Sequence, residues 1–537
     1  MAALLLATIA QADIPRLVSR GTTTQLIVKD NPMLLLAGEL GNSSASDPKY
    51  MSEHWVKLKQ MHLNSVLVPA YWELIEPVEG QFDWSSVDAA IKAARANDLK
   101  LVFLWFGAWK NSMSTYAPSW IKRNPDRFPY AKLPNGLSAE ILSAFAPATR
   151  DADAHAFAAL MKHIQQIDEQ SNTVLMMQVE NEIGMLPVAR EYGSHVDDLF
   201  RNEPVPRALI ERLDKTDINN QTDLFRFWKE HGSKRSGTWS VVFGEGDAAA
   251  EIFQAWHYAE YVNAVAAAGK AAYPLPMYVN VALNRPGKMP GEYPSGGPLP
   301  HLLEVWKAGA PAIDMLSPDI YFPNFVDLVG IYASKDNPLF IPEANNADRS
   351  EVPANAFYAI GKHDAIGFGP FSIESIDDRQ PNKLAEAYAL LEQLAPSILA
   401  AQGSGRMSGF KPRVLFDGTV IDMPVSETIG GYKFTITFVD PHVPKASQDT
   451  ASHGGIIIQH GEEEYLIAGQ GLTVTFAPVG DGLPLAGIDV AEEGTFDKNG
   501  AWIKGRRLNG DQTHQGRHIR LEPGKFQIQK VKLYRYR

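Results

Sequence analysis

The sequence predicts an α/β fold, a (β/α)8 TIM barrel followed by a C-terminal antiparallel β-sandwich. Between residues 31 and 402, apolar runs alternate eight times with helical stretches, the order expected of a parallel sheet covered by helices. Polar residues gather just after these runs, as they do at the active face of a barrel. From residue 403 onward, short β runs alternate with Gly, Asp and Asn turns, a pattern typical of a sandwich.

The expected barrel strands follow one another with room for a helix between them. They cover residues 34–40, 63–72, 101–111, 173–184, 277–282, 315–321, 339–343 and 365–371. One connecting helix is expected at residues 151–170, with Asp151 as its N-cap. A last helix from Lys383 to about Leu399 closes the barrel.

Changes in composition divide the chain into three parts. Residues 1–30 form a lead-in, residues 31–402 the barrel and residues 403–537 the sandwich, with a Gly-rich break at 402–405. An insertion at about residues 185–251 follows the fourth strand, so it should overhang the mouth of the barrel. There it either shapes the site or makes a contact in a homo-oligomer.

Residues 1–12 resemble a secretory signal, because an apolar core precedes an Ala-x-Ala cleavage site. The usual basic segment is missing, so the N-terminal helix of a cytoplasmic protein is the alternative. We expect a periplasmic or secreted protein. The apolar runs are too short to cross a membrane as helices, so no integral membrane span is expected.

The composition argues against several classes of partner and cofactor. A net charge of −12 gives no attraction to nucleic acid or to an anionic membrane surface. The sequence has no cysteine, which excludes disulfides and thiolate chemistry. It also lacks a metal-ligand spacing and a Gly-rich nucleotide loop. We therefore expect no cofactor, no metal and no nucleic acid.

The fourth predicted strand is the most informative stretch of the chain. It begins as an unbroken apolar run and ends in Glu180, Asn181 and Glu182. The seventh predicted strand ends in Glu343 in the same way. These strands are well separated around the barrel, so Glu182 and Glu343 can face each other across its mouth. Glycoside hydrolysis needs such a pair, one carboxylate to attack the sugar and one to protonate the departing oxygen.

Side chains at two other strand ends are candidates for contacts in the same site. Tyr321, at the end of the sixth strand, is placed to donate a hydrogen bond to Glu343 and to keep it ionised. Trp109, Lys110 and Asn111 leave the third strand. There Trp can stack on a sugar ring, and Lys or Asn can bind hydroxyl groups.

Four further glutamates also lie at strand ends: Glu39, Glu76, Glu180 and Glu374. A glutamate at such a position either holds a sugar hydroxyl or orients the neighbouring strands. We take Glu76 and Glu180 as candidates for substrate binding. The other two have less support from their surroundings in the sequence.

Residues 178–184, Gln-Val-Glu-Asn-Glu-Ile-Gly, resemble the acid/base motif of the family 35 β-galactosidases, a retaining group among the barrel glycosidases. The second predicted strand, with Trp72 and Glu76-Pro77, is similar to a signature of that family. The aromatic third strand and residues 368–374 also resemble the neighbouring family 42. This resemblance implies a retaining exo-acting β-galactosidase with a carbohydrate substrate.

The resemblance spans about residues 30–400 and implies a role for three residues. By it, Glu182 is the acid/base, Glu343 is the nucleophile and Asn181 holds the sugar 2-hydroxyl. Family 35 has a His and a sugar-contacting Tyr where this chain has Ile75 and Pro69. The chain therefore looks like a divergent bacterial branch, one that trims galactose from plant side chains such as those of xyloglucan.

Two alternatives to a β-galactosidase stay open. The first keeps the barrel chemistry and changes the sugar to a β-glucoside or an α-L-arabinopyranoside. The second is a carbohydrate-binding protein without catalysis, in which the sandwich binds the ligand. Trp502 is the only tryptophan after residue 403, so we expect an accessory domain that packs against the barrel.

Overall fold

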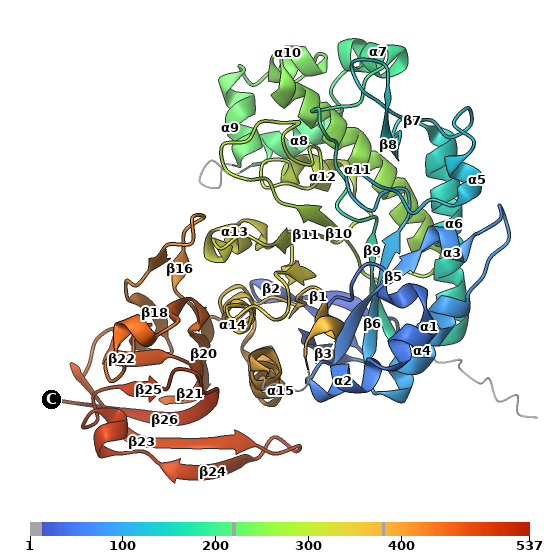
Figure 1. The fold of residues 1–537 in the computed structure, drawn as a ribbon. Coiled ribbons are helices and arrows are strands. Elements are labelled where there is room, and N and C mark those ends of the chain that lie inside the picture. The colour runs from blue at the N-terminus through green and yellow to red at the C-terminus, as the bar shows by residue number, and fades with distance from the viewer. Residues whose placement is uncertain (1–12, 217–221, 378–381) are drawn as a thin grey trace, which may run out of the picture.

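A computed structural model describes residues 13–216, 222–377 and 382–537. The signal-like segment expected at residues 1–12 lies outside the described residues. Figure 1 shows a barrel, a group of short helices beyond one end of it, and a β-rich domain to one side. No helix in the described part of the chain has both the length and the apolar character of a membrane span.

In the described residues, parallel strands close into a barrel in chain order. The strands are β4 (Leu35–Leu36), β5 (Ser65–Tyr71), β6 (Lys100–Phe106), β9 (Val174–Val179), β10 (Met277–Ala282), β11 (Met315–Ile320), β12 (Phe340–Ile341) with β13 (Glu343–Ala344), and β14 (Gly367–Phe368). β14 pairs with β4, and Glu39 bridges to both Leu67 and Phe371, which closes the ring. The predicted fold class is confirmed.

Proline divides the seventh strand into two pieces. Pro342 has no N–H to donate to a neighbouring strand, so the expected strand at 339–343 becomes β12 and β13. β12 pairs with β14, whereas β13 pairs with β11 on the other side. Because β13 begins at Glu343, the break lies directly before the candidate nucleophile.

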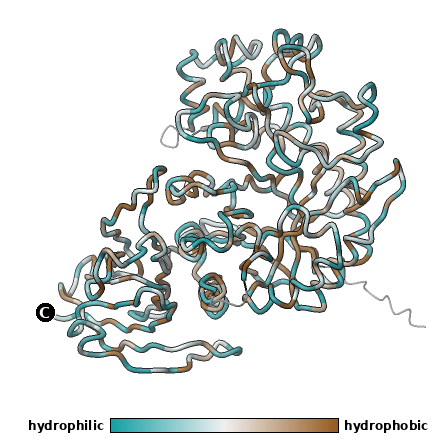
Figure 2. Tube along the Cα trace, viewed as in Figure 1, coloured by the Kyte–Doolittle hydropathy of each residue, from teal (hydrophilic) through white to brown (hydrophobic). Residues whose placement is uncertain are grey.

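A helix follows each barrel strand. These helices are α2 (Trp55–Gln60), α4 (Ser85–Ala96), α6 (Pro147–Asp168), α11 (Asp247–Ala272), α12 (Leu303–Gly309), α13 (Phe325–Tyr332), α14 (Val352–His363) and α15 (Lys383–Ala401). The N-cap expected at Asp151 is wrong, because α6 begins at Pro147. Proline suits the first helical turn, where its missing N–H costs no hydrogen bond. Figure 2 shows the hydrophobic segments interleaved with hydrophilic ones through the barrel.

Shorter elements surround the barrel. They are the antiparallel sheet of β1 (Arg16–Arg20), β2 (Thr23–Val28) and β3 (Asn31–Met33), the loop elements α1 (Pro48–Ser52), α3 (Trp72–Ile75), α5 (Ser119–Lys122), β7 (Tyr130–Lys132) and β8 (Ser138–Leu142), and the insertion helices α7 (Ser194–Asn202), α8 (Arg207–Asp214), α9 (Asp223–Glu230) and α10 (Trp239–Phe243). The insertion follows β9, and Figure 1 shows its helices beyond β10 and β11.

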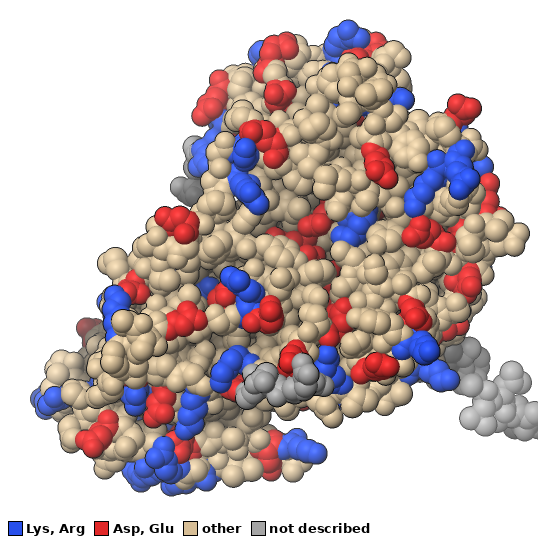
Figure 3. All heavy atoms as spheres, in the orientation of Figure 1, with Lys and Arg blue, Asp and Glu red and all other residues tan. Residues whose placement is uncertain are grey.

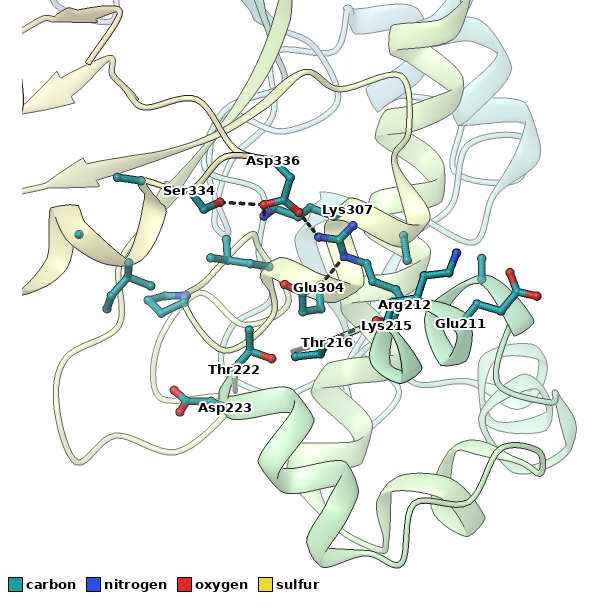
Figure 4. Close-up of a pocket in the computed structure, with 17 residues that line it drawn as sticks. Glu211, Arg212, Lys215, Thr216, Thr222, Asp223, Glu304, Lys307, Ser334 and Asp336 are labelled. Carbon is teal, nitrogen blue, oxygen red and sulfur yellow. Dashed lines mark hydrogen bonds and ion pairs between the residues drawn. The ribbon is translucent and has the colours of Figure 1, made fainter. Parts of the chain in front are cut away.

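A surface pocket of about 960 Å³ lies where α8 meets α12 (Figure 4). Four of the charged side chains that line it are paired with one another. Arg212 contacts Glu304 and Asp336, and Lys307 donates to Asp336 at 2.9 Å. The ion pairs fasten the insertion to the barrel.

The C-terminal domain is an antiparallel sandwich, as predicted. One sheet has the order β15 (Met407–Phe410), β20 (Gly454–Gly461), β21 (Glu464–Gln470), β26 (Gln527–Tyr536), β23 (Leu485–Phe496) and β24 (Trp502–Arg507), and the other β18 (Val425–Ile429), β19 (Tyr432–Thr437), β22 (Leu472–Pro478) and β25 (Ile519–Leu521). A separate hairpin, β16 (Arg413–Val414) and β17 (Val420–Ile421), points toward the barrel (Figure 1).

The sheet that begins with β15 packs on both faces. Ile456 and Ile458 join the barrel core beneath α14 and α15, whereas Ile457 between them joins the core of the sandwich. Gly409 in β15 permits the close approach of this strand to α14. A Cβ atom on Gly409 would lie 2.3 Å from the carbonyl oxygen of Phe357. The C-terminal domain is therefore packed tightly on the barrel.

Tyr388 in α15 contacts both strands at the place where the barrel closes, between β14 and β4. Its buried hydroxyl lies 2.8 and 3.0 Å from the carbonyl oxygens of Ala37 and Phe368, which share its single proton. We expect Tyr388→Phe to lower the free energy of unfolding by about 1–2 kcal/mol, because the buried carbonyls lose this shared donor. Urea titration measures this. Tyr273→Phe is the matched control, since the buried Tyr273 hydroxyl has no partner among the described residues. Equal losses in the two variants would contradict the prediction.

Candidate active site

Glu182 and Glu343 both lie at the carboxyl ends of barrel strands. Glu182 follows β9, and Glu343 begins β13. The Glu182 side chain is 18% exposed, while Glu343 is 7% exposed, so both are largely shielded from water. Acidic and basic atoms lie in a recess near the centre of the face drawn in Figure 3.

The backbone around Glu182 adopts an unusual conformation. Glu180 and Glu182 have φ angles of 61° and 45°, in the left-handed region that non-glycine residues seldom occupy. The N–H of Glu182 donates to Oδ1 of Asn280 at 3.0 Å, across to strand β10. Gln178 Nε2 donates to the carbonyl oxygen of Glu180 at 3.0 Å. These bonds hold the strained turn and aim the Glu182 side chain.

Asn280 connects three strand ends. Its Nδ2 donates to Oδ1 of Asn181 at 3.1 Å and to Oδ2 of Asp319 at 2.7 Å. Asn181 in turn donates from Nδ2 to the carbonyl oxygen of Lys110 at 2.6 Å. A carboxamide has two N–H donors, and the second one on Asn181 has no acceptor among the described residues.

Glu343 is held by two neighbouring side chains. The Tyr321 hydroxyl donates to Oε1 of Glu343, the contact that the sequence led us to expect, and Glu39 makes a second hydrogen bond with the same carboxylate. Burial raises the pKa of Glu343 above its usual value, although the Tyr321 hydrogen bond, the charge of Lys110 and the Glu39 hydrogen bond oppose this rise. The donors therefore favour the ionised form of Glu343.

Glu182 has the properties of a proton donor. Burial and the negative charge of Glu343 raise the pKa of Glu182 to about 7, although Lys110 counteracts them. The ammonium group of Lys110 lies 4.0 Å from Oε2 of Glu182. The negative charge of Glu343 thus favours a proton on Glu182, as a general acid requires.

Two more acids complete the cluster. Burial and the charges of Glu343 and Glu182 raise the pKa values of Glu39 and Asp319 well above the usual range. Both are almost fully buried. Asp319 lies beside Glu343 in the register of β11 and β13. Within the described residues, no group of three or more His, Asp or Glu is arranged to hold a metal ion.

Two residues of the third strand differ from the sequence prediction. Trp109 is fully buried and packs edge to face on Tyr258 and Tyr261 of α11, so it offers no face to a sugar. The Asn111 carboxamide oxygen accepts from the N–H of Met113 at 2.8 Å and fixes a turn. Lys110, between them, is the residue of this trio that faces Glu182.

Glu180 and Glu76 act within the fold. Glu180 is fully buried and accepts from the N–H of Trp109 at 2.8 Å. It also shares a hydrogen bond with buried Asp153 of α6. Glu76 accepts from Trp72 Nε1 at 2.8 Å and from the N–H of Gly80 at 2.7 Å. Their carboxylates orient strand ends and do not face the Glu182–Glu343 pair.

The structure adds Asn280 and Asp319 to the residues found from the sequence. Each is a polar residue near the end of an otherwise apolar strand, β10 and β11. That signal was present in the sequence but was not used. Glu39, taken from the sequence with little support, lies against Glu343, while Glu374 instead accepts from the N–H of Gly41 at 2.9 Å.

Two family models match the sequence. The glycosyl hydrolase family 42 model, described as β-galactosidase, matches residues 44–234, and the domain of unknown function DUF5597 matches residues 384–520. The first match includes Glu182 and lies on the barrel. These observations support a glycoside hydrolase. The match is to family 42 and not to family 35, the family that the sequence resembles over its acid/base motif.

Several solved structures are similar to the glycosidase-like barrel at low identity. The catalytic domain of a β-amylase from Paenibacillus polymyxa is 13% identical, with a TM-score of 0.46 over 66% of this chain and 96% of that chain. A β-galactosidase from Bacillus circulans sp. alkalophilus is 16% identical, with a TM-score of 0.48 over 68% and 57%. A cold-adapted β-galactosidase from Rahnella sp. R3 is 15% identical, with a TM-score of 0.48 over 73% and 59%.

The chain spans less than two thirds of the length of those two galactosidases. No curated protein matches the sequence.

Asn280 allows a test of the hydrogen-bond network. We expect Asn280→Ala to destabilise the protein by about 2–4 kcal/mol, because it removes hydrogen-bond partners from buried Asn181, Asp319 and the Glu182 N–H. Urea unfolding measures the loss. Asn499→Ala, at an exposed position, is the control and should change stability little. A loss in Asn280→Ala no larger than in the control would show that the network does not hold the site.

Proposed function

We propose that the protein is a retaining, exo-acting β-galactosidase that releases terminal β-D-galactosyl residues from oligo- or polysaccharides. The observation that carries this proposal is the pairing of Glu182 with Glu343. The Glu343 carboxylate accepts a hydrogen bond from the Tyr321 hydroxyl, and the pKa of Glu182 is raised to about 7 by burial and by the charge of Glu343. Retaining glycosidases need one ionised and one protonated carboxyl group.

In the first step, the Glu343 carboxylate attacks the anomeric carbon while Glu182 gives its proton to the departing glycosidic oxygen. The bond to the aglycone breaks, and a galactosyl ester on Glu343 forms. Glu182, now a carboxylate, then takes a proton from water as that water attacks the anomeric carbon. Galactose leaves, and both glutamates return to their starting states.

The remaining residues assist this chemistry from fixed positions. The free N–H of Asn181 is the donor we assign to the sugar 2-hydroxyl. Lys110 keeps the pKa of Glu182 from rising further and supplies a second donor near the sugar. Tyr321 orients the nucleophile.

Two observations support galactose and exo action. The family model that matches residues 44–234 is described as β-galactosidase. The low exposure of Glu182 and Glu343 favours the end of a glycan over its interior, because one terminal ring fits a recess that a continuous chain cannot enter. Side chains of plant polysaccharides such as xyloglucan carry such terminal galactose.

Azide tests the two glutamates separately. We expect Glu343→Ala to lose nitrophenyl β-galactosidase activity by at least about 10³-fold, since it removes the covalent step. Azide should partly restore turnover and give α-galactosyl azide, because it attacks the face that Glu343 vacates. Glu182→Ala with azide should give β-galactosyl azide, because azide then opens the galactosyl ester. Product configuration is read by NMR.

The exposed Glu53→Ala is the matched control and should keep full activity. A panel of nitrophenyl β-glucoside, β-fucoside and α-arabinopyranoside compares the sugars. Faster hydrolysis of one of these than of the galactoside would contradict the galactose assignment alone. No turnover of any substrate by the wild type would contradict the proposed function.

Lys110 allows a test of the electrostatics. Lys110 lowers the pKa values of both Glu182 and Glu343, so Lys110→Met should move both limbs of the pH profile of kcat/KM to higher pH. The basic limb reports loss of the Glu182 proton, and in the wild type it should lie near pH 7. Lys122→Met, which removes a partner of Glu73 at the surface, is the control. An unchanged profile in Lys110→Met would contradict the assignment.

A further inference from the structure

A hairpin of the C-terminal domain reaches the active face of the barrel. In the described C-terminal domain, β16 and β17 pair with each other outside both sheets of the sandwich. Figure 1 shows the hairpin beside α13, the helix that follows β11. Arg413 of β16 donates to both carboxylate oxygens of Asp327 in α13, at 2.7 and 3.0 Å. This bidentate pair fixes the hairpin against the exit of β11.

The tip of the hairpin carries an aromatic residue. Residues 415–418 form the turn, closed by a 2.9 Å hydrogen bond from the N–H of Gly418 to the carbonyl oxygen of Leu415. Gly418 has a φ of 86°, which the turn requires. Polar residues and glycine dominate such turns, yet Phe416 stands at the second position. Phe416 remains 40% exposed.

Phe416 connects this tip to the candidate site. Its ring lies edge to face with Phe322, at 5.2 Å between centroids and an interplanar angle of 64°. Phe322 directly follows Tyr321, which donates to Glu343 and is itself 39% exposed. The exposed rings of Tyr321 and Phe416 are thus connected through the partly buried ring of Phe322.

We propose that Phe416 is part of an aglycone subsite, where its ring stacks on a pyranose of the glycan that carries the scissile galactosyl residue. The inference rests on the proposed function and extends it to the domain of unknown function. A pyranose presents an apolar face of C–H groups, which a flat aromatic ring covers well. An edge-to-face contact with Phe322 leaves ring surface free for this stacking.

Anchoring of the domain alone does not account for Phe416. The Arg413–Asp327 pair already fixes the hairpin, and the six-stranded sheet packs over α14 and α15. A residue that served only the interface would be expected to be buried there. Its exposure at the rim of the active face points to a ligand.

The test compares a small substrate with a branched one. We expect Phe416→Ala to lower kcat/KM for a galactosylated xyloglucan oligosaccharide by about 10-fold, the loss of one good stacking contact. Hydrolysis of nitrophenyl β-galactoside should stay within about twofold, because its aglycone is too short to need the subsite. Phe416→Trp should keep the rate on the oligosaccharide.

Tyr534→Ala is the matched control, since Tyr534 is a 45% exposed aromatic residue on β26 of the same domain. Equal losses on both substrates would assign Phe416 to domain packing and overturn the subsite. No loss on either would overturn it as well.

Calorimetric titration with the same oligosaccharide separates the subsite from the proposed function. If the wild type hydrolysed neither galactoside, the proposed function would fail, but weaker binding by Phe416→Ala would still support the subsite. Equal binding by the wild type and Phe416→Ala would overturn the subsite whatever the activity.

Discussion

The burial of four carboxyl groups together is the constraint on which the site depends. Glu39, Glu182, Asp319 and Glu343 crowd the mouth of the barrel, and Lys110 lowers the pKa of each of them. Buried like charges cannot all ionise, so protons must be distributed unequally. The hydrogen bond from the Tyr321 hydroxyl lowers the pKa of Glu343 and so favours a charge there. A charge on Glu343 in turn raises the pKa of Glu182.

The barrel supplies the positions that this distribution needs. β9, β10, β11 and β13 are adjacent in the sheet, and each carries a residue of the network or is followed closely by one. Asn280 ties three of these ends together, and Tyr388 seals the opposite seam. The strained conformation of Glu182 persists because the surrounding hydrogen bonds over-determine it. Stability and chemistry therefore share the same residues.

Sequence patterns predict the barrel and the two glutamates because both depend on local signals. Buried strands produce apolar runs, and a carboxylate that ends such a run stands out, as Glu182 and Glu343 do. The hydrogen bond of Asn280 to the Glu182 N–H joins residues 98 positions apart, so no local pattern reveals it. The expected stacking of Trp109 on a sugar differs from the structure because a residue type does not reveal the direction of its side chain. Its residue type suits a sugar, but its side chain points toward α11, and the next residue, Lys110, faces the site.

The two residues that directly follow β11, Tyr321 and Phe322, make contacts in different directions. Tyr321 faces inward to Glu343, while Phe322 meets the hairpin of the C-terminal domain. Under the proposed function, the barrel would bind the galactosyl residue and the hairpin would contact the remainder of the glycan. The Arg413–Asp327 pair and the Phe416–Phe322 contact hold the hairpin at the exit of β11, the position that this division requires.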